Sequence, residues 1–138
     1  MFPNRILVGY DGSAEADRAL DLAAELARAS RGTLIIEHVV SIGAEAYAAG
    51  VLDLDALEAA LGKMLDGAVE RANRAGVTAT KVLSRGDVAT TILRDAEREG
   101  VDLIVVGSLG RGRMARMLMG SVADKLVRAA PVPVLVVR

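Results

Sequence analysis

The chain contains no cysteine and very few aromatic residues. Its 138 residues include one phenylalanine, two tyrosines, one histidine and no tryptophan. Without cysteine there is no disulfide framework, no thiol redox chemistry and no cysteine-ligated zinc, which favours a reducing cytoplasmic location. With so few rings there is no platform on which single-stranded nucleic acid could stack. We therefore expect a cytoplasmic protein that does not bind RNA or single-stranded DNA.

The chain also lacks excess charge of either sign and long apolar runs. A formal net charge of −1 gives no bulk attraction to nucleic acid or to an acidic membrane. No run approaches the roughly 18 apolar residues of a membrane span, and the N-terminus does not resemble a signal peptide. What is present is a hydrophobic content of 52%, enough for a buried core. The length fits one domain over residues 1–138.

Short apolar runs alternate with segments of helical period along the whole chain, a pattern typical of a parallel sheet. The expected strands are Arg5–Gly9, Thr33–Val40, Thr78–Leu83, Leu103–Val106 and Val134–Val137. Strict alternation predicts an α/β fold, a doubly wound five-stranded parallel sheet with helices on both faces. Ligands of such sheets bind beyond the carboxyl ends of the strands, where the strand order reverses. We expect the first and fourth strands to flank that point.

Each predicted helix has a recognisable start. Ser13 and Asp87 stand where N-caps are expected, and a longer helix begins near Asp53. Ser121 and Asp124 fit the capping-box pattern at the start of the last helix. The third strand is half polar, which favours a place at the edge of the sheet.

The loop after the fourth strand reads GSLGRGRMARMLMGSV, from residue 107 to residue 122. Glycines allow backbone amides to approach a ligand closely, and a helix N-terminus adds free amides and a positive dipole end, so the arrangement favours phosphate. The alternative is that the glycines form only a flexible turn. The GxGxxA match of Gly110, Gly112 and Ala115 is a weak dinucleotide signal outside the first βα turn, and Gly62-Lys63 is not followed by the Ser or Thr of a P-loop.

The spacing of Gly107, Gly110, Gly120 and Ser121 resembles the GxxG(x9)GS signature of nucleotide-binding universal stress proteins. The resemblance extends from ILVGYDGS near the start, through HVV at 38–40, to GSVADKLVRAAPVPVLVV at the end. It implies a Rossmann-like fold of the adenine nucleotide alpha hydrolase type, here predicted with strand order 3-2-1-4-5. It also implies a bound adenine nucleotide, ATP or a related molecule. Mg²⁺ could accompany ATP through its phosphates and water, since no carboxylate cluster marks a metal site in the sequence.

The resemblance further implies a set of nucleotide-binding residues from four segments of the chain. These are Gly9, Tyr10, Asp11, Val39, Val106, Gly107, Leu109, Gly110, Gly120, Ser121, Val122 and Ala123. Asp11 with Gly9 and Tyr10 would hold the adenosine end, and Val39 the adenine edge. The residues from Gly107 on would line the ribose and phosphate path. An Asp-Gly pair after a strand is also an ordinary turn, so Asp11 has a second, purely structural interpretation.

No residue set predicts rapid catalysis or a protein-built metal site. The single histidine, His38, lies in a strand and is interpreted as a packing or hydrogen-bonding residue. The leading hypothesis is an adenine-nucleotide-binding stress-response sensor or regulatory module. Alternatives are a weak ATPase with Asp11 and Ser121 near the reacting phosphate, a cyclic AMP-binding protein, and a nucleotide-free dimeric interaction module. The apolar strand Val134–Val137 at a sheet edge predicts a homodimer through that strand, as the resemblance also implies.

Overall fold

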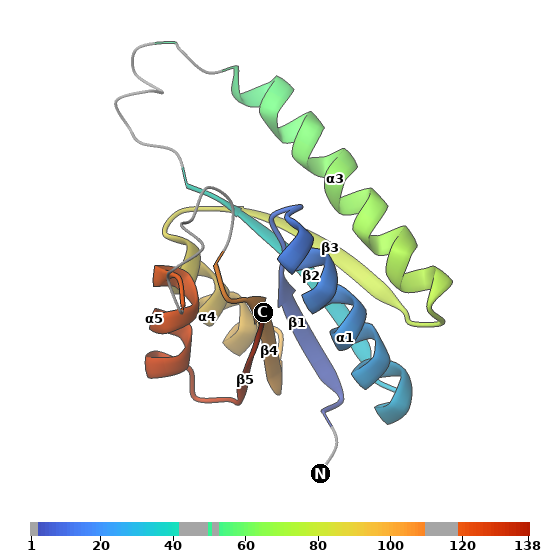
Figure 1. The fold of residues 1–138 in the computed structure, drawn as a ribbon. Coiled ribbons are helices and arrows are strands. Elements are labelled where there is room, and N and C mark those ends of the chain that lie inside the picture. The colour runs from blue at the N-terminus through green and yellow to red at the C-terminus, as the bar shows by residue number, and fades with distance from the viewer. Residues whose placement is uncertain (1–2, 42–49, 51–52, 110–118) are drawn as a thin grey trace.

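Five parallel strands form the centre of the molecule (Figure 1). The computed structural model describes residues 3–41, 50, 53–109 and 119–138. The strands are β1 (Arg5–Gly9), β2 (Thr33–Val40), β3 (Ala79–Arg85), β4 (Leu103–Gly107) and β5 (Val134–Val137). Their order is β3-β2-β1-β4-β5, with parallel pairing at every step. The predicted fold class and strand order are confirmed.

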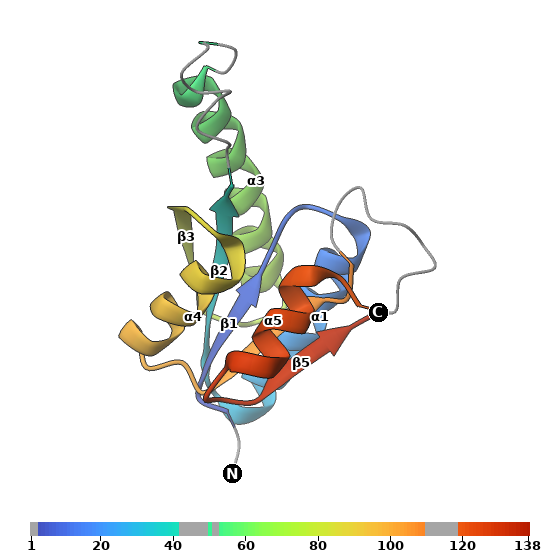
Figure 2. The same cartoon turned by 90° about the vertical axis from the view of Figure 1, so that its left-hand side faces the viewer.

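Helices cover both faces of this sheet. They are α1 (Ala14–Ser30), α3 (Leu54–Arg74), α4 (Val88–Arg98) and α5 (Ser121–Ala129). Figure 2 shows α5 in front of the sheet and α1 behind it. One buried cluster joins α1 and α3 to the sheet, and a second joins α4 and α5 to the other face. The chain order of the elements therefore gives a doubly wound sheet.

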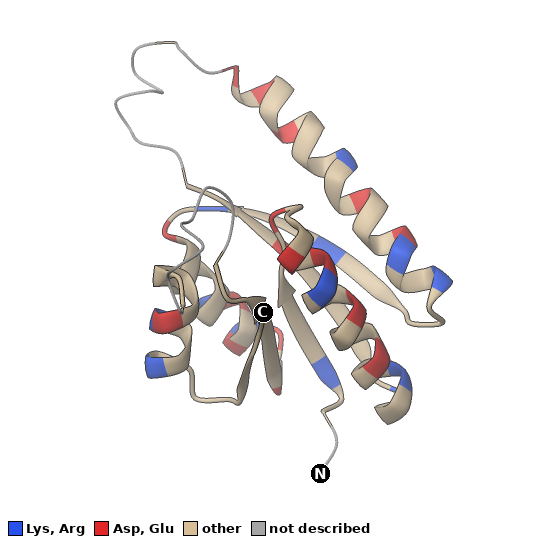
Figure 3. Ribbon diagram, in the orientation of Figure 1, with Lys and Arg blue, Asp and Glu red and all other residues tan. Residues whose placement is uncertain are grey.

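Side-chain alternation in the strands produces these two cores. Ile6 and Val8 of β1 pack in the cluster with α1 and α3, whereas Leu7 between them packs with α4 and α5. All three are fully buried, as expected for a central strand covered on both faces. Lys, Arg, Asp and Glu lie mostly on the helices and are sparse on the strands (Figure 3).

The structure corrects two details. β3 covers Ala79–Arg85 instead of Thr78–Leu83, because its pairing with β2 continues through Ser84 and Arg85 despite their polarity. Backbone hydrogen bonds, not apolar composition, set the length of this edge strand. Ser121 is the first residue of α5 and not its N-cap. Gly120 occupies the cap position and makes no side-chain cap hydrogen bond, so the predicted capping box is wrong.

Candidate ligand cavity at the switch point

A cavity of about 510 Å³ lies beyond the carboxyl ends of β1 and β4. These two strands are adjacent in the sheet and lead to elements on opposite faces, so the cavity lies where the strand order reverses. Eleven of the twelve predicted residues line it, and the twelfth, Gly110, lies outside the described residues. The eleven are Gly9, Tyr10, Asp11, Val39, Val106, Gly107, Leu109, Gly120, Ser121, Val122 and Ala123.

The turn after β1 is fixed by short polar contacts. The amide of Ser13 donates to Asp11 Oδ1 (2.9 Å), and Ser13 Oγ caps α1 by accepting from the amide of Ala16 (3.1 Å). The turn interpretation of Asp11 is therefore confirmed, since its carboxylate shapes the turn, and the residue also lines the cavity. The Nδ1–H of His38 donates to the carbonyl oxygen of Tyr10 (2.7 Å), which confirms the hydrogen-bonding role expected for His38.

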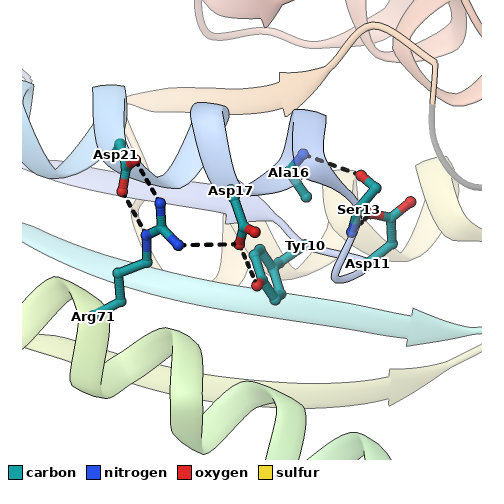
Figure 4. Close-up of polar contacts among 7 residues, drawn as sticks. All are labelled: Tyr10, Asp11, Ser13, Ala16, Asp17, Asp21 and Arg71. Carbon is teal, nitrogen blue, oxygen red and sulfur yellow. Dashed lines mark hydrogen bonds and ion pairs between the residues drawn. The ribbon is translucent and has the colours of Figure 1, made fainter.

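Tyr10 connects the cavity wall to α1 and α3 (Figure 4). Its hydroxyl donates to Asp17 Oδ1 (2.6 Å), and the guanidinium of Arg71 on α3 lies 3.8 Å from the same oxygen. Arg71 also donates two hydrogen bonds of 2.7 Å to Asp21. Burial, with the hydrogen bond to Asp17, raises the pKa of Tyr10 to about 12, and the hydrogen bonds from Arg71 lower the pKa of Asp21. The phenol therefore stays neutral and holds α1 and α3 together beside the cavity.

Close approach between the walls requires glycine at two positions. A Cβ at Gly9 would lie 3.0 Å from Val106 Cγ1, and one at Gly120 would lie 3.2 Å from the carbonyl oxygen of Ser108. The amide of Gly120 donates to that same oxygen. A larger residue would require a shift of a few tenths of an ångström by the Val106 side chain at Gly9 or by the Ser108 backbone at Gly120.

The start of α5 offers backbone donors next to the cavity. The N-cap residue, Gly120, makes no side-chain hydrogen bond to the first turn. Ser121, Val122 and Ala123 all line the cavity. A helix N-terminus of this kind favours an anion. Asp124 would oppose an anion if it faced the cavity, but its carboxylate accepts from Arg128 Nε at 3.0 Å and the residue does not line the cavity.

Glu15 of α1 holds the loop that leaves β4. Its Oε2 accepts from the amide of Leu109 (2.8 Å) and from the hydroxyl of Ser108 (3.1 Å). The contact joins residues that are 94 positions apart in the chain. It fixes the start of the glycine-rich loop against the first turn of α1.

Sequence reasoning missed several residues of the cavity wall. These are Ser13, Ala16, Glu37, His38, Ser41, Leu61, Val88, Ile92 and Ser108. Glu37 alone carried a signal, as a carboxylate within the apolar run TLIIEHVV. The others come from α1, β2, α3, α4 and loops, and their approach to the cavity depends on the tertiary fold. Among the described residues, no group of three or more His, Asp or Glu side chains could hold a metal ion.

Within the described part of the chain, no helix is long and apolar enough to cross a membrane. The cavity has apolar walls from Val39, Val106 and Ile92 and the start of α5 at one end, features that are common in small-molecule sites. The arginines and methionines of the loop between residues 110 and 118 lie outside the described residues.

Comparison with known proteins agrees with this geometry. The model of the universal stress protein family matches residues 3–138. The chain is 36% identical over 149 residues to universal stress protein YxiE of Bacillus subtilis, with 98% of this chain and 99% of that protein covered. A crystal structure of a universal stress protein in complex with cAMP has a TM-score of 0.79 and 28% identity, covering 100% of this chain and 98% of that one.

A second solved structure is that of the universal stress protein from Archaeoglobus fulgidus in complex with dAMP. It has a TM-score of 0.76 and 26% identity, and each chain is covered completely. The two solved structures share the fold of this chain over its whole length. The chain belongs to the universal stress protein family.

Proposed function

We propose that this protein binds an adenine nucleotide in the cavity between β1 and β4 and acts as a nucleotide-dependent regulator in the stress response. The observation that carries the proposal is the convergence on one cavity of about 510 Å³ of the β1 turn, the β4 exit and the α5 N-terminus. This volume is within the range of small-molecule and cofactor sites. The structural neighbours in complex with cAMP and dAMP support an adenine nucleotide as the ligand.

The residues fit such a ligand by chemical type. Val39, Val106 and Ile92 provide apolar surface for a base, and Asp11 can accept hydrogen bonds from ribose hydroxyls. The amides at the start of α5 suit phosphate oxygens. Mg²⁺, if bound, would be held through the phosphates and water, since hard cations prefer such oxygen ligands. ATP is the nucleotide that we propose, and cyclic AMP is the second candidate because one neighbour contains it.

The experiment is calorimetric titration with ATP, AMP and cyclic AMP, preceded by mass spectrometry of any small molecule released on denaturation. Binding of at least one of the three nucleotides is expected. A flat titration with all three, on protein shown to carry no retained nucleotide, would leave the dimeric interaction module as the better account.

A glycine substitution locates the binding site. Gly120→Val places a Cβ 3.2 Å from the Ser108 carbonyl oxygen and branches it over the α5 amides, so we expect ATP affinity to fall by about tenfold or more. Gly62→Val is the matched control, because a Cβ at Gly62 meets nothing within 4 Å. Wild-type affinity in Gly120→Val, or equal losses in both variants, would contradict the proposed phosphate end of the cavity.

We also propose that the protein is a homodimer through β5. This strand is an edge of the sheet, and the carbonyl oxygens of Pro133, just before it, and Val137 accept from the amides of Ile104 and Ser108. By the alternation of a parallel ladder, Val136 directs its backbone groups outward. Val136→Pro removes an outward N–H while keeping the bonds to β4, and sedimentation should show a dimer for wild type and a monomer for the variant. A monomeric wild type would overturn the proposal.

A further inference from the structure

Three polar side chains meet between β2, β3 and α4: the buried Glu37 and Asp95 and the half-buried Ser84. Glu37 is 1% exposed and Asp95 is 2% exposed. Ile35 and Val39, on either side of Glu37 in β2, pack in the cluster with α4, so strand alternation places Glu37 on the α4 face. The Ser84 hydroxyl oxygen lies 2.9 Å from Glu37 Oε2 and 3.1 Å from Asp95 Oδ2.

The geometry of the three side chains requires an additional proton. A serine hydroxyl has one hydrogen and can donate to only one acceptor at a time, yet Ser84 lies within hydrogen-bond distance of two carboxyl groups. If both carboxyls were ionised, one of these contacts would join two acceptors. A protonated carboxyl resolves the conflict, because its O–H can donate to Ser84 or to the other carboxylate.

One further oxygen points to the same proton. Glu37 Oε1 is buried and has no hydrogen-bond partner among the described residues, whereas Asp95 Oδ1, which also lacks a hydrogen bond, is ion-paired with Arg98 and Arg94. Two buried carboxylates in contact repel each other and have lost their hydration, so one of them normally retains its proton. The cluster therefore has both the place and the need for one proton.

The surrounding charges indicate which carboxyl is ionised. On α4, Arg98 Nη2 lies 3.3 Å and Arg94 Nε 3.6 Å from Asp95 Oδ1, and Arg98 is shared with Glu99 (3.6 Å). The hydrogen bond with Glu37 lowers the pKa of Asp95, while burial, reinforced by Asp95, raises the pKa of Glu37 to about 8. Glu37 thus carries the proton at neutral pH.

On the neighbouring strands and next to Glu37 on β2, the nearby side chains are a leucine, a histidine and a serine. On β1 the side chain on this face is Leu7, which packs in the α4 cluster. His38 follows Glu37 on β2 but directs its ring to the carbonyl of Tyr10. On β3 the polar group is Ser84 itself, paired in register with Val39.

The cluster adjoins the ligand cavity. Glu37, Val88 and Ile92 all line the cavity, and the last two belong to α4, the helix that carries Asp95. The carbonyl oxygen of Glu37 accepts from the amide of Tyr10 (2.8 Å). A change of charge at Glu37 therefore acts on two walls of the cavity.

We propose that Glu37, Ser84 and Asp95 form a buried proton-binding site whose occupied form favours an anionic ligand in the adjacent cavity. Loss of the proton leaves Glu37 as a carboxylate and releases H⁺ to solvent. The second negative charge then repels Asp95 on α4 and any phosphate in the cavity. By reciprocity, a bound anion must strengthen proton binding. The part of the proposal that concerns the ligand rests on the proposed function.

The proton itself is tested without any ligand. Infrared difference spectra and carbon-13 NMR of glutamate-labelled wild-type protein should show one protonated glutamate carboxyl at about pH 7, well above the ordinary pKa of glutamate. The signal should disappear in Glu37→Gln and persist in Glu25→Gln, a matched change of an exposed glutamate on α1. If wild-type protein shows no protonated glutamate at this pH, the proton site is refuted, whatever the variants do.

The coupling is tested by titrating ATP and cyclic AMP by calorimetry. Cyclic AMP has no phosphate group that titrates in the range used. Between about pH 7 and about pH 9.5 we expect wild-type affinity to fall by about fivefold or more, while Glu37→Gln, which fixes a neutral side chain, shows no such fall. Equal pH profiles for the two proteins would overturn the coupling. If neither nucleotide binds at any pH, the proposed function fails, while the carboxyl signal still decides the proton site.

Discussion

Replacing Glu37 by glutamine should change how stability depends on pH. The side chain is fully buried, and its pKa is raised from 4.5 to about 8. Between these values the folded protein holds a proton that the unfolded chain has released. The contribution of Glu37 to the free energy of unfolding is therefore fully present below about pH 4.5, and it is lost progressively as the pH rises to about 8.

The size of this loss follows from the shift. While the folded state holds one proton more than the unfolded state, each unit of rise in pH lowers the free energy of unfolding by up to about 1.4 kcal/mol. From about pH 5 to about pH 7.5 the free energy of unfolding should fall by roughly 3 kcal/mol, or about 10 °C in Tm for a chain of this size. The carboxyl groups of Asp21 and Asp95 have lowered pKa values, so they are ionised in both states across this window and add no slope.

Circular dichroism during heating measures this effect, since the chain has no tryptophan for fluorescence. Wild type and Glu37→Gln are compared at several pH values, so that every other titrating group cancels in the difference. The variant should show a flatter profile and the larger Tm at about pH 8. Parallel profiles would refute the assignment of the proton to Glu37. Glu25→Gln, at an exposed position, should follow wild type.

Two other substitutions test how α3 is held on the sheet. Leu65 is the large fully buried side chain of this helix, and Leu65→Ala should lower the free energy of unfolding, measured in urea, by about 2–5 kcal/mol. Leu61 is half-buried, so Leu61→Ala should lower it less. Equal losses in the two variants would contradict the packing. Arg71→Met removes the ion pairs with Asp17 and Asp21, but the arginine side chain is 45% exposed, so about 1 kcal/mol or less is expected, decreasing in high salt. A salt-independent loss of several times that size would show that packing, not charge, holds the helix.

The fold was predictable because its signals are local. Each signal lies within a few residues of the element that it predicts. These signals are the apolar runs of strand length, the caps Ser13 and Asp87, and the glycines after the helices. The structure confirms these caps, with Ser13 Oγ and an Asp87 carboxylate oxygen each accepting an amide of the first helical turn. The one cap predicted wrongly, Ser121, lies inside the helix because the carbonyl of the preceding Gly120 accepts the first helical hydrogen bond, from the amide of Asp124.

The cavity was predictable only in part, and the reason is sequence separation. Its glycines and Asp11 lie in two loops whose spacing is visible in the chain. Glu37 and Asp95 are 58 positions apart, and Arg71 meets Asp21 across 50 positions. No periodicity or motif brings such pairs together. They meet because β2 underlies α4 and because α3 packs on α1, and both are consequences of the sheet order.

The most direct test of the account is a crystal structure of this protein grown with excess ATP. We expect nucleotide density in the cavity between β1 and β4, with the ribose beside Asp11 and the phosphates at the first turn of α5, where Ser121, Val122 and Ala123 line the cavity. An empty cavity at saturating ATP, or a nucleotide bound elsewhere on the molecule, would contradict the central claim.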